Sequence, residues 1–112
     1  MKAPVLNRQL TLEDSYRVPD NAGGFTTEWQ PLGQLWAQVI AGTGREQAVN
    51  ALPLSRVPYK VTVRAAPVGA PSRPHAGQRF REGSRIFSIN AVTEQDSEGR
   101  YLLCQAQEEV AV

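Results

Sequence analysis

The chain has 112 residues, of which 41% are hydrophobic and 21% are charged, and this composition is typical of one globular domain. Twelve basic against eleven acidic residues give a formal net charge of +1, which excludes a bulk polycation that coats nucleic acid nonspecifically. No apolar run reaches the roughly 18–20 residues of a bilayer span, so we expect no membrane partner. The single cysteine excludes an internal disulfide and favours a reducing compartment.

The N-terminal part of the chain predicts an arm, a strand and a turn. Residues 1–8 lack the apolar stretch of a secretory signal, and we expect them to form a flexible arm. Alternating apolar residues then predict a strand whose inward positions are Leu10, Leu12 and Tyr16. On its other side we expect Thr11 and Glu13 to face outward. Residues 20–24 predict a tight turn, because aspartate, asparagine and glycine tolerate the left-handed backbone region.

Two strands are predicted between this turn and residue 40. The first covers residues 25–29 and has on one side Phe25, Thr27 and Trp29. We expect Pro31 to end it, because proline cannot donate to a sheet ladder. The second covers residues 35–40 and is apolar on both faces, which places Leu35, Ala37 and Val39 opposite Trp36, Gln38 and Ile40. Such a strand is central in its sheet or packs against a neighbouring subunit, so Trp36 is either a core or an interface residue.

Three further strands are predicted, over residues 59–65, 87–91 and 101–107. Residues 82–85 are expected to turn into the second of these, and residues 95–99 have the turn chemistry that joins it to the last. Six short strands with almost no helix predict an all-β fold, a small antiparallel barrel or sandwich that occupies residues 1–112 as a single domain.

Two long connections interrupt the strands. In residues 41–58, Thr43 and Glu46 have the spacing of a capping box, so we expect one or two helical turns over residues 45–52, ended by Pro53. Residues 66–78 contain three prolines and two glycines and predict an extended surface loop. Loops of this length in a small domain are usually functional.

The sequence shows no constellation of catalytic or metal-binding residues. One histidine, His75, and one cysteine cannot supply the ligands of an ordinary zinc site. Cys104 alternates into the apolar face of the last strand, so we expect a core residue and not a nucleophile. Glu108 and Glu109 are adjacent in a strand and point to opposite faces, so they do not form an acid/base pair. We therefore predict that the chain is not an enzyme and needs no cofactor or metal.

Charge is distributed unevenly along the chain. Between residues 45 and 85 there are eight basic and two acidic residues, whereas residues 88–112 have five acidic residues and one arginine. This pattern fits ordinary solvated surface, contacts between neighbouring subunits, or one face that meets a polyanion. The basic residues that a strand and its adjoining loop would present to phosphates are Arg45, Arg56, Lys60 and Arg64.

Segments spread over nearly the whole chain resemble one family. They are LTLE at 10–13, DNAGGF at 20–25 with Trp29, LWAQV at 35–39, GRE at 44–46, YKVTVR at 59–64, RIFSINAV at 85–92 and YLLC at 101–104. In this order they resemble the head–tail joining proteins of long-tailed bacteriophages, also called head-closure, head-completion or stopper proteins. The chain departs from the family pattern in its Pro- and Ala-rich connection 64–77 and at residues 56–58.

The resemblance implies a β-barrel that assembles into a ring of about twelve identical subunits between a portal-side adaptor and the tail. Such a ring seals packaged double-stranded DNA in the head and docks the tail terminator or tail tube, and residues 41–58 would face its channel. It implies a virion component, assembled in the bacterial cytoplasm, of a phage, a prophage or a gene transfer agent. Combined with the charge pattern, it predicts that the residues near the DNA lumen are Arg45, Arg56, Lys60 and Arg64. Candidates for subunit contacts, besides the N-terminal arm, are Trp36, Glu108 and Glu109.

Two alternative functions stay open at this point. The chain is either another connector component, an adaptor or tail terminator, or an unrelated β-barrel interaction module. A helical adaptor needs long amphipathic helices, and a tail terminator alternates helices with strands. The sequence pattern shows neither arrangement.

Overall fold

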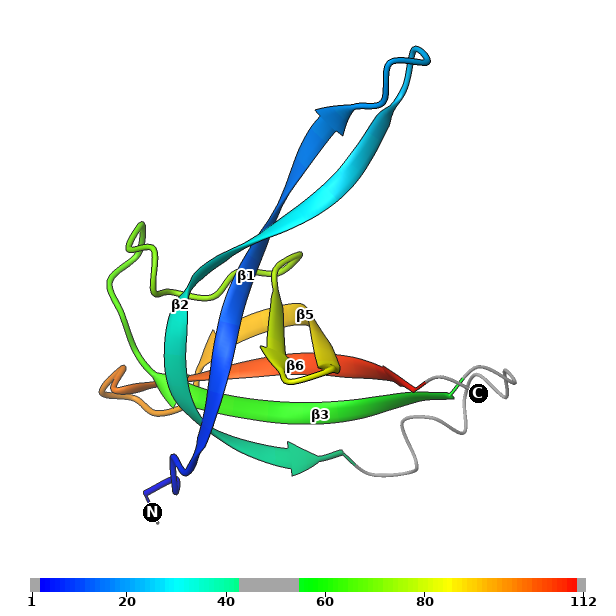
Figure 1. The fold of residues 1–112 in the computed structure, drawn as a ribbon. Helices are drawn as coiled ribbons and strands as arrows, with labels where there is room; N and C mark the ends of the chain where they lie inside the picture. Colours follow the sequence, from blue (N-terminus) through cyan, green and yellow to red (C-terminus); the bar gives the residue numbers. More distant parts are fainter. Residues whose placement is uncertain (1–2, 43–54, 111–112) are drawn as a thin grey trace.

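A computed structural model describes residues 3–42 and 55–110, and in these ranges the chain forms strands and no helix (Figure 1). The strands are β1 (Arg8–Pro19), β2 (Phe25–Ala41), β3 (Ser55–Arg64), β4 (Arg79–Glu82), β5 (Arg85–Glu94) and β6 (Tyr101–Val110). They pair antiparallel in the order β1-β2-β3-β6-β5-β4, and β4 pairs back to β1 to close the barrel. The predicted all-β antiparallel barrel is therefore confirmed. Within the described ranges, accordingly, no helix has the length and apolarity that crossing a membrane requires.

The short helix predicted over residues 45–52 is not confirmed, because that segment lies outside the described residues. The strands that flank it reach further than predicted. β2 runs to Ala41 and β3 begins at Ser55, and the two are tied just beyond β2 by a bond from the Gly42 N–H to the Pro58 carbonyl, at 2.7 Å. Strand pairing therefore occupies both ends of the connection that was expected over residues 41–58.

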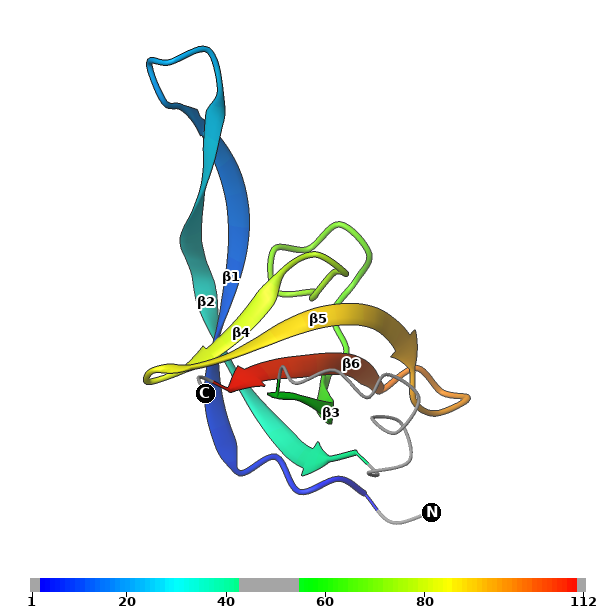
Figure 2. The same ribbon diagram turned by 90° about the vertical axis from the view of Figure 1, so that its right-hand side faces the viewer.

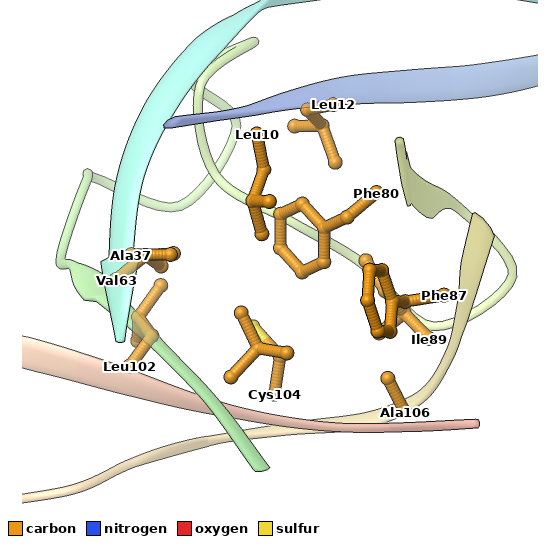
Figure 3. Packing of buried hydrophobic residues seen from close by; sticks show 11 residues of the cluster. Leu10, Leu12, Ala37, Val63, Phe80, Phe87, Ile89, Leu102, Cys104 and Ala106 are labelled. Atoms are coloured by element: carbon orange, nitrogen blue, oxygen red, sulfur yellow. The ribbon is translucent and has the colours of Figure 1, made fainter. Parts of the chain in front are cut away.

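The core lies inside the barrel and is filled by one side chain from every second position of each strand (Figure 3). Its fully buried or nearly buried members are Leu10, Leu12, Ala37, Val61, Val63, Phe80, Phe87, Ile89, Leu102, Cys104 and Ala106. Phe80 and Phe87 come from the paired strands β4 and β5 and are the largest of them. Tyr59 meets the Phe87 ring edge-on, with centroids 5.1 Å apart. Small residues such as Ala37 and Ala106 also line the core, so large and small side chains share its interior (Figure 3).

β2 is one continuous strand, so the prediction that Pro31 ends a strand is wrong. The two strands predicted over residues 25–29 and 35–40 are the two halves of β2. Between them the register with β1 shifts: Leu12 pairs with Gly33 and Glu13 pairs with Pro31, which leaves Leu32 as an extra residue. Proline is tolerated at such a bulge because the ladder is already interrupted there. Gly33 has φ +147°, in the region that favours glycine.

The bulge reverses which side of β2 faces the core. Beyond it, Leu35, Ala37 and Val39 share one face, as predicted, and this face is the inward one. Before it, Trp29 pairs with Ser15 and stands on the outer side of the sheet. In an uninterrupted strand these odd-numbered residues would share one face. The extra residue therefore separates an outward aromatic half from an inward aliphatic half.

The distal halves of β1 and β2 form a hairpin that leaves the body of the barrel (Figures 1 and 2). The predicted turn at its tip is confirmed: the Asp20 N–H donates to the Gly24 carbonyl at 3.0 Å, and Asp20 Oδ1 accepts from the N–H groups of Ala22 and Gly24. Asn21 adopts φ 63° there. The projecting hairpin raises the Cα radius of gyration to 15.2 Å, against about 13 Å for a compact chain of this length.

The sequence pattern missed β4, which is only four residues long and has one inward side chain, Phe80. Residues 82–85 form the predicted turn, and β4 and β5 pair across it as a tight hairpin. Residues 66–78 lie between strands, as predicted. Their path is fixed by polar contacts, among them bonds from Arg73 Nη1 to the Ala66 carbonyl and from the His75 N–H to Gln78 Oε1.

Replacing Phe80 with alanine should lower the free energy of unfolding by about 3–5 kcal/mol, because the ring is fully buried and its removal leaves a cavity. Equilibrium urea unfolding of the purified chain measures this loss. Val68→Ala is the control, since that side chain is 83% exposed and should change stability by less than about 0.5 kcal/mol. Equal unfolding midpoints for the two variants would contradict the assignment of Phe80 to the core.

Candidate assembly surface

Two exposed apolar side chains stand on the outside of the barrel, on the proximal half of β2. Trp36 is 55% exposed and Ile40 is 51% exposed. Ile40 lies directly across from Lys60 of β3, and Gln38 lies across from Thr62. We call five outward residues of these two strands the outer β2–β3 surface: Trp36, Gln38, Ile40, Lys60 and Arg64. Thr62, which stands between Lys60 and Arg64 on the same side, is buried.

The structure excludes one of the two interpretations of Trp36, and the interface interpretation stays a prediction. A core position is wrong, because more than half of the side chain is exposed while its neighbour Ala37 is fully buried. The segment before β1 reaches this surface, since the Val5 N–H donates to Gln38 Oε1 at 2.9 Å. Val5 itself is 57% exposed. Trp36 and Ile40 therefore stand exposed on the same outer side of β2.

The structure describes three of the four predicted channel residues. They lie at every fourth position of β3, on the outer side of the barrel. Arg56 pairs with Glu109 of β6 at 3.3 Å, near the end of both strands. Lys60 and Arg64 are exposed and make no ion pair within residues 3–42 and 55–110. Arg45 lies outside the described residues. The channel assignment stays a prediction, and it concerns the same surface as the interface assignment of Trp36.

Glu108 and Glu109 have separate surroundings, as their adjacent positions predict. Glu109 is exposed beside Arg56. Glu108 is 9% exposed and accepts two bonds from Arg85, from Nε at 2.8 Å and from Nη2 at 3.0 Å. Arg85 Nη2 also donates to the Tyr59 hydroxyl at 3.2 Å. Glu108 is therefore engaged inside its own subunit, and its role in a subunit contact stays a prediction.

This ion pair continues into a chain of charges that ties β1, β4, β5 and β6 together. Arg8 binds Glu82 through both Nε and Nη2, and Arg85 lies 3.8 Å from the same carboxylate. The bond from Arg85 holds the pKa of Glu108 below its usual value, and the bond from Arg8 does the same for the pKa of Glu82. Both carboxylates are thus charged at neutral pH, and their ion pairs connect the four strands.

A second cluster lies where the hairpin leaves the barrel. Glu13 is on the outer side of β1, as alternation predicts, but it is only 2% exposed. Arg79 and Arg81 of β4 cover it, with Nε and Nη2 at 2.7 and 2.8 Å from its two oxygens. Arg79 also stacks on Trp29, 4.1 Å from the ring centroid. Sequence patterns gave no sign of this cluster, because only the β1–β4 pairing brings its members together.

Cys104 and His75 are the two residues whose chemistry the sequence singled out. Cys104 is fully buried, and this burial raises the pKa of its thiol to about 12, so the predicted core role is confirmed. His75 is exposed in the loop of residues 66–78. Among residues 3–42 and 55–110, no group of three or more His, Cys, Asp or Glu side chains is placed to hold a metal ion.

Comparison with known proteins identifies the relatives of the chain. Residues 1–109 match the family described as phage head completion protein. A chain in the virion of a native gene transfer agent particle is 55% identical, with a TM-score of 0.84 over 98% of this chain and 100% of that one. Protein SF1141 from Shigella flexneri 2a is 18% identical, with a TM-score of 0.67 over 96% of each chain, and shares the fold. No curated protein matches the chain.

Replacing Glu108 with glutamine should remove about 1–3 kcal/mol of stability at pH 7, because the charged bonds to Arg85 are lost. The folded-state pKa of Glu108 is lowered, so its contribution is present above the unfolded pKa of about 4.3 and disappears as the pH falls through the folded value. The difference from wild type in urea unfolding should therefore shrink on acidification. Glu109→Gln is the control, with an exposed pair worth at most about 1 kcal/mol. A difference independent of pH would contradict this account.

Replacing Trp36 with serine should change the free energy of unfolding by less than about 0.5 kcal/mol, because the side chain is not part of the core. Replacing its buried neighbour Ala37 with leucine is the matched variant, and overpacking should cost about 1–3 kcal/mol. Thermal unfolding of the two purified variants measures both effects. A strongly destabilised Trp36→Ser chain would show that Trp36 supports the fold.

Proposed function

This chain belongs to the phage head completion protein family, and we propose that it forms a ring that closes the DNA-filled head of a phage-like particle and receives the tail. In this role it is a structural connector subunit without catalytic chemistry. DNA would pass through the centre of the ring, and the faces of the ring would contact a portal-side adaptor and the tail terminator or tail tube.

The observation that carries the proposal is the full-length likeness to a chain of a native gene transfer agent virion. At 55% identity and a TM-score of 0.84, with both chains covered almost completely, the two share their fold over the same length. The family match covers the same residues. The Shigella protein supports the fold alone, because its identity is 18%.

The geometry fits a wall-forming subunit. The closed barrel leaves no unpaired central strand, and ion pairs hold β1, β4, β5 and β6 at one end, so each subunit is a rigid block. The exposed Trp36 and Ile40 give this block an apolar surface that a neighbour can cover. Because residues 3–42 and 55–110 contain no helix, they do not favour a helical adaptor or a helix-containing tail terminator.

Deleting the gene from the strain that produces the particle should leave heads that lose their DNA and do not carry tails. Electron microscopy counts tailed heads, and DNA in purified particles is measured after nuclease treatment. Expression of the wild-type chain from a plasmid should restore both. Tailed, nuclease-resistant particles in the deletion strain would overturn the proposed function.

A further inference from the structure

The projecting hairpin has two chemically different faces. Cross-strand pairing places Asp14 opposite Gln30 and Tyr16 opposite Glu28, so these side chains share one face. The bond from the Tyr16 hydroxyl to Glu28 Oε1, at 3.1 Å, shows that the two side chains lie together. We call this side the acidic hairpin face: Asp14, Tyr16, Val18, Thr26, Glu28 and Gln30. It continues the side of β1 that faces the core within the barrel, where Leu10 and Leu12 stand.

The opposite face of the hairpin has a different character. Arg17 stacks over Phe25 there, 4.3 Å from the ring centroid, and Trp29 lies under Arg79 at the base. Tyr16, which the sequence predicted to face inward, is 42% exposed on the acidic hairpin face, and Glu28 and Gln30 are exposed beside it. A two-stranded ribbon in water is marginally stable, so a hairpin of this length gains stability from a partner that covers one of its faces.

The chain itself presents a surface of complementary charge and polarity. On the outer β2–β3 surface, Lys60 and Arg64 have no ion-pair partner within residues 3–42 and 55–110. They stand beside Trp36 and Ile40. The hairpin thus has two carboxylates and a tyrosine on this face. The barrel has two cations and two apolar side chains that complement them in charge and polarity. The hairpin extends away from β3 in both views, so the two surfaces do not meet within one subunit (Figures 1 and 2).

We propose that the acidic hairpin face of one subunit binds the outer β2–β3 surface of the next copy of this chain. This inference rests on the proposed function, and it identifies the contact between neighbouring subunits of the ring. The two surfaces are different, so the contact is head-to-tail and repeats from subunit to subunit until the ring closes. Asp14 and Glu28 pair with the cations Lys60 and Arg64, while Tyr16 packs on the apolar residues.

A second copy of the chain fits this surface better than DNA does. Protein–DNA interfaces are polar and strongly positive, whereas the two cations here are bordered by an exposed tryptophan and an isoleucine. Aromatic residues are enriched in protein interfaces. The acidic hairpin face would repel phosphate, whereas it complements a basic protein surface.

Charge reversal on the two surfaces tests the contact in the deletion strain. Asp14→Lys with Glu28→Lys, or Lys60→Glu with Arg64→Glu, should each lower the yield of tailed, nuclease-resistant particles at least about tenfold, because like charges then meet. The chain with all four reversals should recover to within about threefold of wild type, since the charges match again. Circular dichroism of each purified chain checks folding. Ser15→Lys with Thr27→Lys, on the other hairpin face, is the control and should assemble normally.

Each outcome of this test decides the proposal. Recovery by the fourfold variant supports it. Normal yield from either double reversal, or two defects that do not compensate, overturns it. If only the Lys60 and Arg64 reversal releases DNA and the hairpin reversal does not restore retention, these cations contact DNA and the proposal is likewise overturned.

A cross-link separates this inference from the proposed function. Particles are assembled from a chain with Tyr16→Cys and Lys60→Cys and then oxidised; Cys104 is fully buried and does not compete. A ladder of covalent oligomers is expected on a nonreducing gel, and Tyr16→Cys alone should give none. Particles that contain the chain but yield no ladder overturn the hairpin contact and leave the connector role intact. Particles without the chain overturn the connector role.

Discussion

The structure depends on the one-residue bulge that interrupts the pairing of β1 and β2 at Leu32 and Gly33. Without it, the alternation of β2 would bring Trp29 to the same side as Leu35, inside a barrel that two phenylalanines already fill. With it, one strand supplies the aliphatic wall of the core and then continues as half of a projecting hairpin. An added twist is the usual consequence of a bulge, and it accounts for the departure of the hairpin from the barrel wall (Figure 2).

The charges around the bulge fix the direction in which the hairpin leaves. Glu13 is the residue of β1 at which the register changes, and Arg79 and Arg81 hold both of its oxygens from the closing strand β4. The Arg79 guanidinium is in turn flat against Trp29 of β2. A buried carboxylate is costly unless it is paired and hydrogen-bonded, and here it is both. The same residues that compensate the charge thus connect β1, β2 and β4 at the base of the hairpin.

The sequence predicted those features that depend on neighbours along the chain. The turn at Asp20–Gly24, the alternation around Val61 and the burial of Cys104 follow from local residue types and agree with the structure. The errors at Pro31 and in the missed strand β4 have one cause, which is that both depend on the register of pairing with β1, and local residue types do not show that register. The register of that pairing also decides that Glu13 is covered. For the surface, the two-sided pattern around Trp36 limited its role to core or interface, and the exposure of the side chain excludes the core.

The two surfaces that we assign to the ring contact are mechanically linked through β2. Glu28 lies on one side of the bulge and Trp36 on the other, eight positions along the same strand. Because the strand is paired with β1 on both sides of the bulge, the angle between the hairpin and the outer β2–β3 surface is set by the bulge and by the Glu13 cluster. In a head-to-tail ring, that angle determines how far each subunit is rotated from the last. The feature that allows this chain to fold as a closed barrel is therefore also the feature that would set the curvature of its assembly.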